Sequence, residues 1–300
     1  MRTQVEPEQL AGTKVRIAYT IDLHYDVFAP SDFVFNIHAA HTDQQRVLSE
    51  TVAIDPQGAW RVETEPWLGN RLLRLRAQAG ALDVHYDGDV EVTQHVADPA
   101  GVLALPLDQL PVETLGFLWP SRYCQSDRVQ QLAWREFGAL PPGHAQVDAI
   151  CRWVRSHVEF RVGTSTIATS ALETLEHGVG VCRDFVHVTI ALLRSLNYPA
   201  RFATGVDYGA PADMGPPDFH SYVETYIGDR WWVFDPTGIT PVTGLIRIGT
   251  GRDAADVAFA TMFGNVSGNM PQVSFAAAHD PASGVLTPSP TRFAISTAAL

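Results

Sequence analysis

The stretch from residue 218 to residue 237 constrains the fold more than any other part of the chain. Two runs rich in aromatic and β-branched residues flank the dipeptide Gly228-Asp229. Such a dipeptide between two strand-like runs predicts a β-hairpin with a two-residue turn. We expect Ile227 to pair with Arg230 across this turn.

That pairing brings a histidine close to an aspartate. Tyr222 then faces Asp235, and His220 lies two residues farther along the same face. Diagonal neighbours on one face of a sheet lie about 7–8 Å apart, within reach of long side chains. A carboxylate beside an imidazole fixes the tautomer of the ring and stabilises its protonated form. A bulge or a one-residue register shift would separate the pair and leave two unrelated surface groups.

A cysteine lies at the predicted start of a helix. Gly178-Val-Gly180-Val precedes Cys182, and apolar residues then recur at helical spacing up to Leu196. Unpaired backbone N–H groups and the helix dipole stabilise negative charge at such a position, which favours a thiolate and a developing oxyanion. Cys182 is therefore a candidate nucleophile. The alternative is a small core residue, because free cysteines are often buried.

The first hundred residues are typical of an antiparallel β-sandwich. Short strand-like runs occupy residues 15–25, 33–38, 71–76 and 84–92, with turn signals between them. Residues 98–111 break this pattern and are the predicted linker.

Helical spacing begins after the linker and indicates a second unit. Apolar residues recur at helical intervals over 147–158, and 171–175 predicts a further short helix. We therefore expect an N-terminal β-sandwich domain over residues 1–108, a catalytic domain over 109–275 and a loose C-terminal tail over 276–300.

Composition narrows the class of protein. The net charge of −12 is unsuited to a nucleic-acid-binding surface, and no run approaches the roughly 18 apolar residues of a membrane helix. The N-terminus lacks the apolar segment of a secretory signal. Three cysteines form a poor disulfide framework and fit a reducing compartment. We expect a cytoplasmic protein that binds neither nucleic acid nor membrane.

No metal or cofactor is expected. The chain has no C-x-x-C, no H-x-x-x-H and no calcium-loop pattern, although Cys182, His220 and Asp235 are each possible metal ligands.

Three segments in this order resemble the transglutaminase-like superfamily of papain-like thiol enzymes. They are Gly180-Val-Cys182-Arg-Asp-Phe, His220 after a phenylalanine, and Trp232-Val-Phe-Asp235-Pro-Thr. Further segments are similar to the bacterial branch, whose catalytic unit follows a β-sandwich; they begin at Ala171, Tyr198 and Gly251. The resemblance implies an α+β fold in which a helix carrying the cysteine packs on an antiparallel sheet carrying the histidine and the aspartate.

The resemblance also implies roles: Cys182 as nucleophile, His220 as base and then acid, and Asp235 as the group that orients His220. The side-chain oxyanion donor of some relatives has no clear match here; the candidates are Trp153, Thr164 and Ser165.

The predicted function is a thiol-dependent peptidase or amidase that forms a thioester with a peptide or small amide substrate. Acyl transfer to an amine, as in transamidation, stays open, as does transfer on a small or cyclic metabolite amide. A catalytically silent peptide-binding module is the alternative from another class. The oligomeric state is not specified by the sequence.

Overall fold

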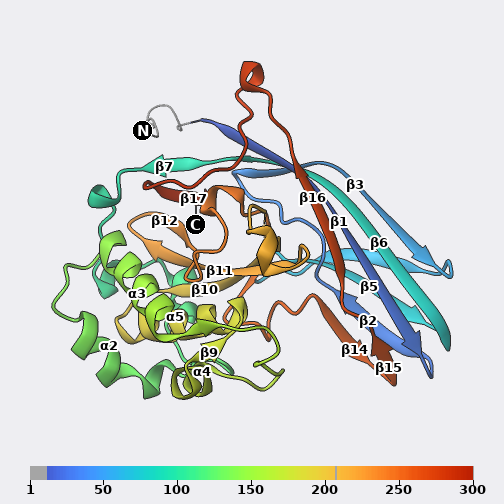
Figure 1. Ribbon diagram of the computed structural model, residues 1–300, viewed down its shortest axis with the longest axis horizontal. Coiled ribbons are helices and arrows are strands. Elements are labelled where there is room, and N and C mark those ends of the chain that lie inside the picture. Colours follow the sequence, from blue (N-terminus) through green and yellow to red (C-terminus); the bar gives the residue numbers. More distant parts are fainter. Residues whose placement is uncertain (1–11, 207, 300) are drawn as a thin grey trace.

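The computed structural model describes residues 12–206 and 208–299, and its α+β fold agrees with the prediction (Figure 1). Two antiparallel sheets form a β-sandwich on one side of the molecule, and a six-stranded sheet covered by helices forms the other side. Within the described ranges, no helix is long and apolar enough to cross a membrane.

The sandwich consists of two packed sheets. One has the order β15-β1-β6-β3, with β16 also paired to β1, and the other has the order β14-β2-β5-β4. Their bounds are β1 Lys14–Val27, β2 Ser31–Phe35, β3 Gln45–Asp55, β4 Trp60–Thr64, β5 Arg71–Ala77, β6 Gly80–Thr93, β14 Ala260–Phe263, β15 Val266–Gly268 and β16 Gln272–Ala277.

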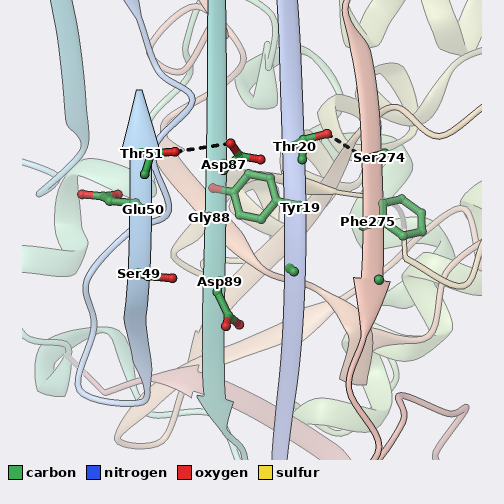
Figure 2. A pocket seen from close by; sticks show the side chains of 12 residues that line it. Tyr19, Thr20, Ser49, Glu50, Thr51, Asp87, Gly88, Asp89, Ser274 and Phe275 are labelled. Atoms are coloured by element: carbon green, nitrogen blue, oxygen red, sulfur yellow. Dashed lines mark hydrogen bonds between the residues drawn. The ribbon is translucent and has the colours of Figure 1, made fainter. Parts of the chain in front are cut away.

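Strict alternation along β1 explains why these residues form a sandwich. Ile17, Tyr19 and Ile21 are at most 1% exposed and belong to the core between the sheets. Thr20, between them, lies on the outer face, where its hydroxyl contacts that of Ser274 in β16 at 2.7 Å. Figure 2 shows this outer face, where polar side chains line a pocket of about 300 Å³. Period-two burial of this kind specifies strand register because a one-residue slip would expose the core set.

The six-stranded sheet has the order β13-β10-β11-β12-β17-β7. Its strands are β7 His95–Ala97, β10 Ala200–Val206, β11 Phe219–Ile227, β12 Arg230–Phe234, β13 Arg247–Gly251 and β17 Ala294–Ala298, and the parallel pair β8 Glu159–Phe160 and β9 Val179–Gly180 lies apart from it. The helices are α2 Gln130–Phe137, α3 His144–His157, α4 Ala171–His177 and α5 Cys182–Ser195. Short 3-10 helices cover Pro99–Gly101, Leu107–Gln109, Val112–Phe117, Ser126–Arg128, Ala212–Met214, Val242–Gly244 and Pro281–Ser283.

Helix α5 is the centre of this second core. Every residue from Asp184 to Ser195 is buried, and the helix packs on β10 and β11 as well as on α2, α3 and α4. Phe185, Val188 and Leu192 lie in the same apolar cluster as Val223 of β11. The helix and the hairpin are thus fixed to each other, as the fold prediction requires.

The chain crosses between the two halves more often than the sequence indicated. Strands β14, β15 and most of β16 come from a segment that we assigned to the catalytic domain, yet all three pair with β1 or β2 of the sandwich. The prediction of a loose tail is wrong for Ala294–Ala298, which form buried strand β17 between β12 and β7. Backbone hydrogen bonds to distant strands order both segments.

Candidate active site

Cys182 is the first residue of α5 and differs from the other two cysteines in its exposure. Its side chain is partly exposed, whereas Cys124 and Cys151 are buried in the core around α5. Burial raises the pKa of the Cys124 thiol to about 12 and raises the pKa of the Cys151 thiol as well. Among the three thiols, Cys182 therefore has the environment in which a nucleophile can meet a substrate.

A buried carboxylate fixes the helix start that carries Cys182. Oδ2 of Asp184 accepts the backbone N–H of Val181 at 2.9 Å, although Asp184 is fully buried. A side chain at Gly180 would come within 2.7 Å of the Asp184 Cβ, so the close approach requires glycine. Sequence reasoning did not assign Asp184 a role. The signal was an acidic residue three positions after the helix N-cap, the acidic half of a capping box.

Arg183 ties a neighbouring loop to the same helix start. Its Nη2 donates to Ser165 Oγ at 2.5 Å and to the Thr166 carbonyl at 2.6 Å. The loop also carries Val162 and Ile167, whose side chains are 74% and 82% exposed. The residue after Cys182 thus positions a loop with two exposed apolar side chains.

The hairpin has the predicted register. Ile227 pairs with Arg230 and Val223 pairs with Phe234, so the ladder ends directly before Asp235. His220 is 3% exposed, and its Nε2 lies 3.4 Å from Oδ1 of Asp235. This distance describes an ion pair rather than a well-aligned hydrogen bond.

Two threonines hold the Asp235 carboxylate. Oδ1 accepts the backbone N–H and the hydroxyl of Thr237, at 2.9 and 2.6 Å. Oδ2 accepts the corresponding groups of Thr240, at 3.1 and 3.2 Å. These four donors orient the carboxylate while it faces His220. The sequence prediction gave neither threonine a role, because that role depends on how the chain turns after β12.

The three candidate groups interact electrostatically. Burial alone would lower the pKa of His220, but the Asp235 carboxylate and the Cys182 thiol outweigh it and raise the pKa to about 10. For Asp235, burial acts to raise the pKa, yet His220 and the threonine donors lower it to about 2. The structure therefore brings Cys182, His220 and Asp235 together, and the buried imidazole interacts with both the thiol and the carboxylate.

The candidate oxyanion donors have other contacts. The Trp153 ring stacks on His157 with centroids 3.8 Å apart. The Thr164 hydroxyl donates to the Arg161 carbonyl, and Ser165 Oγ accepts from Arg183. These contacts leave the backbone N–H groups at the start of α5 as the better candidates for an oxyanion.

Nearly the whole chain is similar to a solved protein. A crystal structure from Cytophaga hutchinsonii, called there a "putative cysteine protease", superposes with a TM-score of 0.87 at 36% sequence identity, covering 94% of this chain and 97% of that one. The chain belongs to the transglutaminase-like superfamily. The superfamily model matches residues 133–236, and a model described as "Bacterial transglutaminase, N-terminal domain" matches residues 14–111.

Mycobacterial proteins are also relatives of this transglutaminase-like chain. An uncharacterised protein of Mycobacterium leprae is 37% identical over 119 residues, a match covering 37% of this chain and 42% of that protein. An uncharacterised protein of Mycobacterium tuberculosis is 25% identical over 278 residues, covering 83% of this chain and 87% of that protein. The superfamily model and the solved relative together support a thiol-dependent enzyme in broad terms.

Proposed function

We propose that the protein hydrolyses amide bonds, with Cys182 as nucleophile, His220 as base and acid, and Asp235 as the group that orients His220. One observation carries the proposal: a buried imidazole contacts an anchored carboxylate and also interacts with the partly exposed thiol at a helix start. An imidazolium held beside a cysteine stabilises the thiolate, which is the reactive form.

The acylation step follows from these positions. The Cys182 thiolate, having given its proton to His220, attacks the carbonyl carbon of the substrate amide. The carbonyl oxygen becomes a tetrahedral oxyanion, which backbone N–H groups at the start of α5 stabilise. His220 then returns the proton to the leaving nitrogen; the C–N bond breaks, and the acyl group stays on sulfur as a thioester.

Water completes the reaction. Neutral His220 takes a proton from a water molecule, the resulting hydroxide attacks the thioester, and the C–S bond breaks to release the acid. The name given to the 36% identical relative supports hydrolysis over transfer to an amine. The exposed apolar side chains of Val162 and Ile167, on the loop tied to Arg183, support a peptide or amide with an apolar group near the scissile bond.

The first experiment measures the rate of Cys182 alkylation by iodoacetamide from pH 5 to 9. A free cysteine has a pKa of about 8.5. We expect wild type to be alkylated rapidly well below this pH, and His220→Ala to lose this low-pH reactivity. The matched control is His157→Ala, which removes an exposed histidine of α3 and leaves the profile unchanged. Cys182→Ala identifies the site that is labelled. If wild type and His220→Ala both react as a free thiol does, the enzyme proposal is wrong, and a catalytically silent peptide-binding module becomes the better interpretation.

A second assay separates hydrolysis from transamidation. Fluorogenic peptide amides are screened for release of the amine, with and without a fluorescent primary amine as a competing acceptor. Hydrolysis predicts free acid as the product even when the amine is present. Accumulation of the amine adduct instead of the acid would contradict the proposal of a hydrolase while leaving Cys182 as the nucleophile.

A further inference from the structure

A second pocket lies away from Cys182, His220 and Asp235, where the sandwich, the six-stranded sheet and the end of β17 meet. Its volume is about 660 Å³, and its walls come from residues 40–43, residues 67–70 and the strands β10, β12 and β13. This volume lies within the range of small-molecule sites in proteins.

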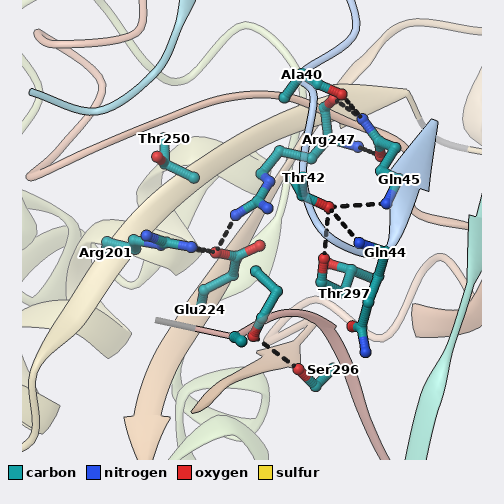
Figure 3. A network of polar contacts seen from close by, with 12 residues as sticks. Ala40, Thr42, Gln44, Gln45, Arg201, Glu224, Arg247, Thr250, Ser296 and Thr297 are labelled. Carbon is teal, nitrogen blue, oxygen red and sulfur yellow. Dashed lines mark hydrogen bonds and ion pairs between the residues drawn. The ribbon is translucent and has the colours of Figure 1, made fainter. Parts of the chain in front are cut away.

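Two arginines line this pocket, with a carboxylate behind them. Arg201 Nε donates to Glu224 Oε2 at 2.7 Å, and Arg247 Nη1 donates to the same oxygen at 3.0 Å (Figure 3). The Glu224 side chain is fully buried and is not part of the pocket wall, whereas both arginines are. The pocket therefore meets the guanidinium groups and not their acidic partner.

Arg201, Arg247 and Glu224 together carry a net charge of one positive unit. Burial acts to raise the pKa of Glu224, but the two arginines lower it overall, so the residue is ionised and offsets one of the two charges. Arg247 is only 5% exposed, and no acceptor among residues 12–206 and 208–299 reaches its Nε. Buried charges are normally paired. The acids that line the pocket, Asp43 and Glu113, are exposed, and Asp43 accepts the backbone N–H of Ala299.

Aromatic side chains form the apolar part of the wall. The Arg201 guanidinium lies over the Trp231 ring, 4.0 Å from its centroid. Trp67, which is 58% exposed, stacks on Phe117 with ring centroids 6.3 Å apart. Indole and phenyl side chains therefore line the pocket together with the arginines.

We propose that this pocket binds an organic carboxylate, with its carboxyl group on Arg201 and Arg247 and its apolar body along Trp67 and Trp231. Guanidinium groups bind carboxylates through charge-assisted, often bidentate hydrogen bonds. The site is separate from the proposed amide chemistry and does not depend on it.

The test uses three probes that differ in the head group: 3-phenylpropionate, its neutral analogue 3-phenylpropan-1-ol, and phenyl phosphate. Isothermal titration calorimetry on the full chain measures each Kd. We expect 3-phenylpropionate to bind at least about tenfold more tightly than the alcohol, a difference of about 1.4 kcal/mol. Equal binding of the acid and the alcohol, or tighter binding of the phosphate, overturns the carboxylate assignment, and so does the absence of binding.

Variants locate the site. Arg247→Gln is expected to raise the Kd for 3-phenylpropionate about tenfold or more, and Arg247→Lys, which keeps the charge, to raise it less. The control is Arg74→Gln, which removes an exposed arginine of β5 paired with Glu63 and leaves the Kd unchanged. Circular dichroism confirms folding. Trp67→Ala, at an exposed position, gives a second variant if the buried one unfolds, and weaker binding is expected. An unchanged Kd in the folded variants overturns the proposal.

Discussion

Oδ1 of Asp235 lies 3.4 Å from Nε2 of His220, one residue beyond the last paired position of the β11–β12 hairpin. Asp235→Asn keeps the shape of the side chain and removes the charge that raises the pKa of His220. We expect kcat/KM for amide hydrolysis to fall on the order of 100- to 10,000-fold. Low-pH alkylation of Cys182 should fall as well. The control is Asp229→Asn in the exposed hairpin turn. Wild-type activity in Asp235→Asn would exclude an orienting role.

Thr237 is expected to act through Asp235 rather than on substrate. Its hydroxyl donates to Oδ1, the same oxygen that faces His220, and this bond lowers the pKa of Asp235. Thr237→Val should reduce kcat/KM about tenfold, because a hydrogen bond to a charged group contributes roughly 1.5–3 kcal/mol. Thr237→Ser should restore activity, since it keeps the hydroxyl.

Thr243→Val is the matched control for this residue. It removes another buried hydroxyl from the same part of the chain, one that binds the carbonyl of Ser289 instead of Asp235. A comparable loss of kcat/KM in Thr243→Val, or no rescue in Thr237→Ser, would indicate a general effect on stability.

The parts of the site that the sequence predicted are those set by local signals. Gly228-Asp229 determines the register of the hairpin, and this register places His220 and Asp235 at the same end of it, where their side chains meet. The apolar stripe of α5 likewise indicates the helix, and the Gly-rich turn before Cys182 indicates that the helix begins there, at the first residue observed.

The parts that were missed depend on contacts between distant segments. Strand β17 is rich in alanine, serine and threonine and carries a weak strand signal, so its order comes from pairing with β12 and β7. Likewise, Glu224 and Arg247 are 23 positions apart, and nothing local indicates that they share a buried ion pair. No period or turn signal in the sequence encodes such partners.

Ile167 is expected to contribute to substrate binding. It is 82% exposed on the loop that Arg183 holds, so an apolar substrate group can pack on it at little cost. Ile167→Ser should raise KM several-fold for substrates with an apolar side chain and leave kcat nearly unchanged, because contact area is lost equally from the ground and transition states. Steady-state kinetics separates the two constants. Leu107→Ser, at another exposed position, is the control. A fall in kcat alone would argue against a binding role.

His144 is expected to make the fold less stable in acid. It is the first residue of α3, its ring lies 4.6 Å from that of Phe234, and burial lowers its pKa to about 4, with Asp148 opposing the shift. As the pH falls from 6.5 to 4, the unfolded chain binds a proton at this position and the folded chain does not. The free energy of unfolding therefore decreases, by at most about 1.4 kcal/mol per pH unit.

His144→Phe removes this titration and keeps a ring against Phe234. We expect the loss of stability between pH 7.5 and 4.5 to be smaller in the variant than in wild type by about 2 kcal/mol, measured by urea unfolding at both pH values. The substitution also changes packing against Phe234, but that effect on the free energy of unfolding is the same at both pH values. It therefore cancels when the two pH values are compared within one protein. The exposed His157→Ala is the control and should retain the wild-type difference. An equal loss of stability in His144→Phe and wild type would show that His144 is protonated in the folded chain as readily as in the unfolded one.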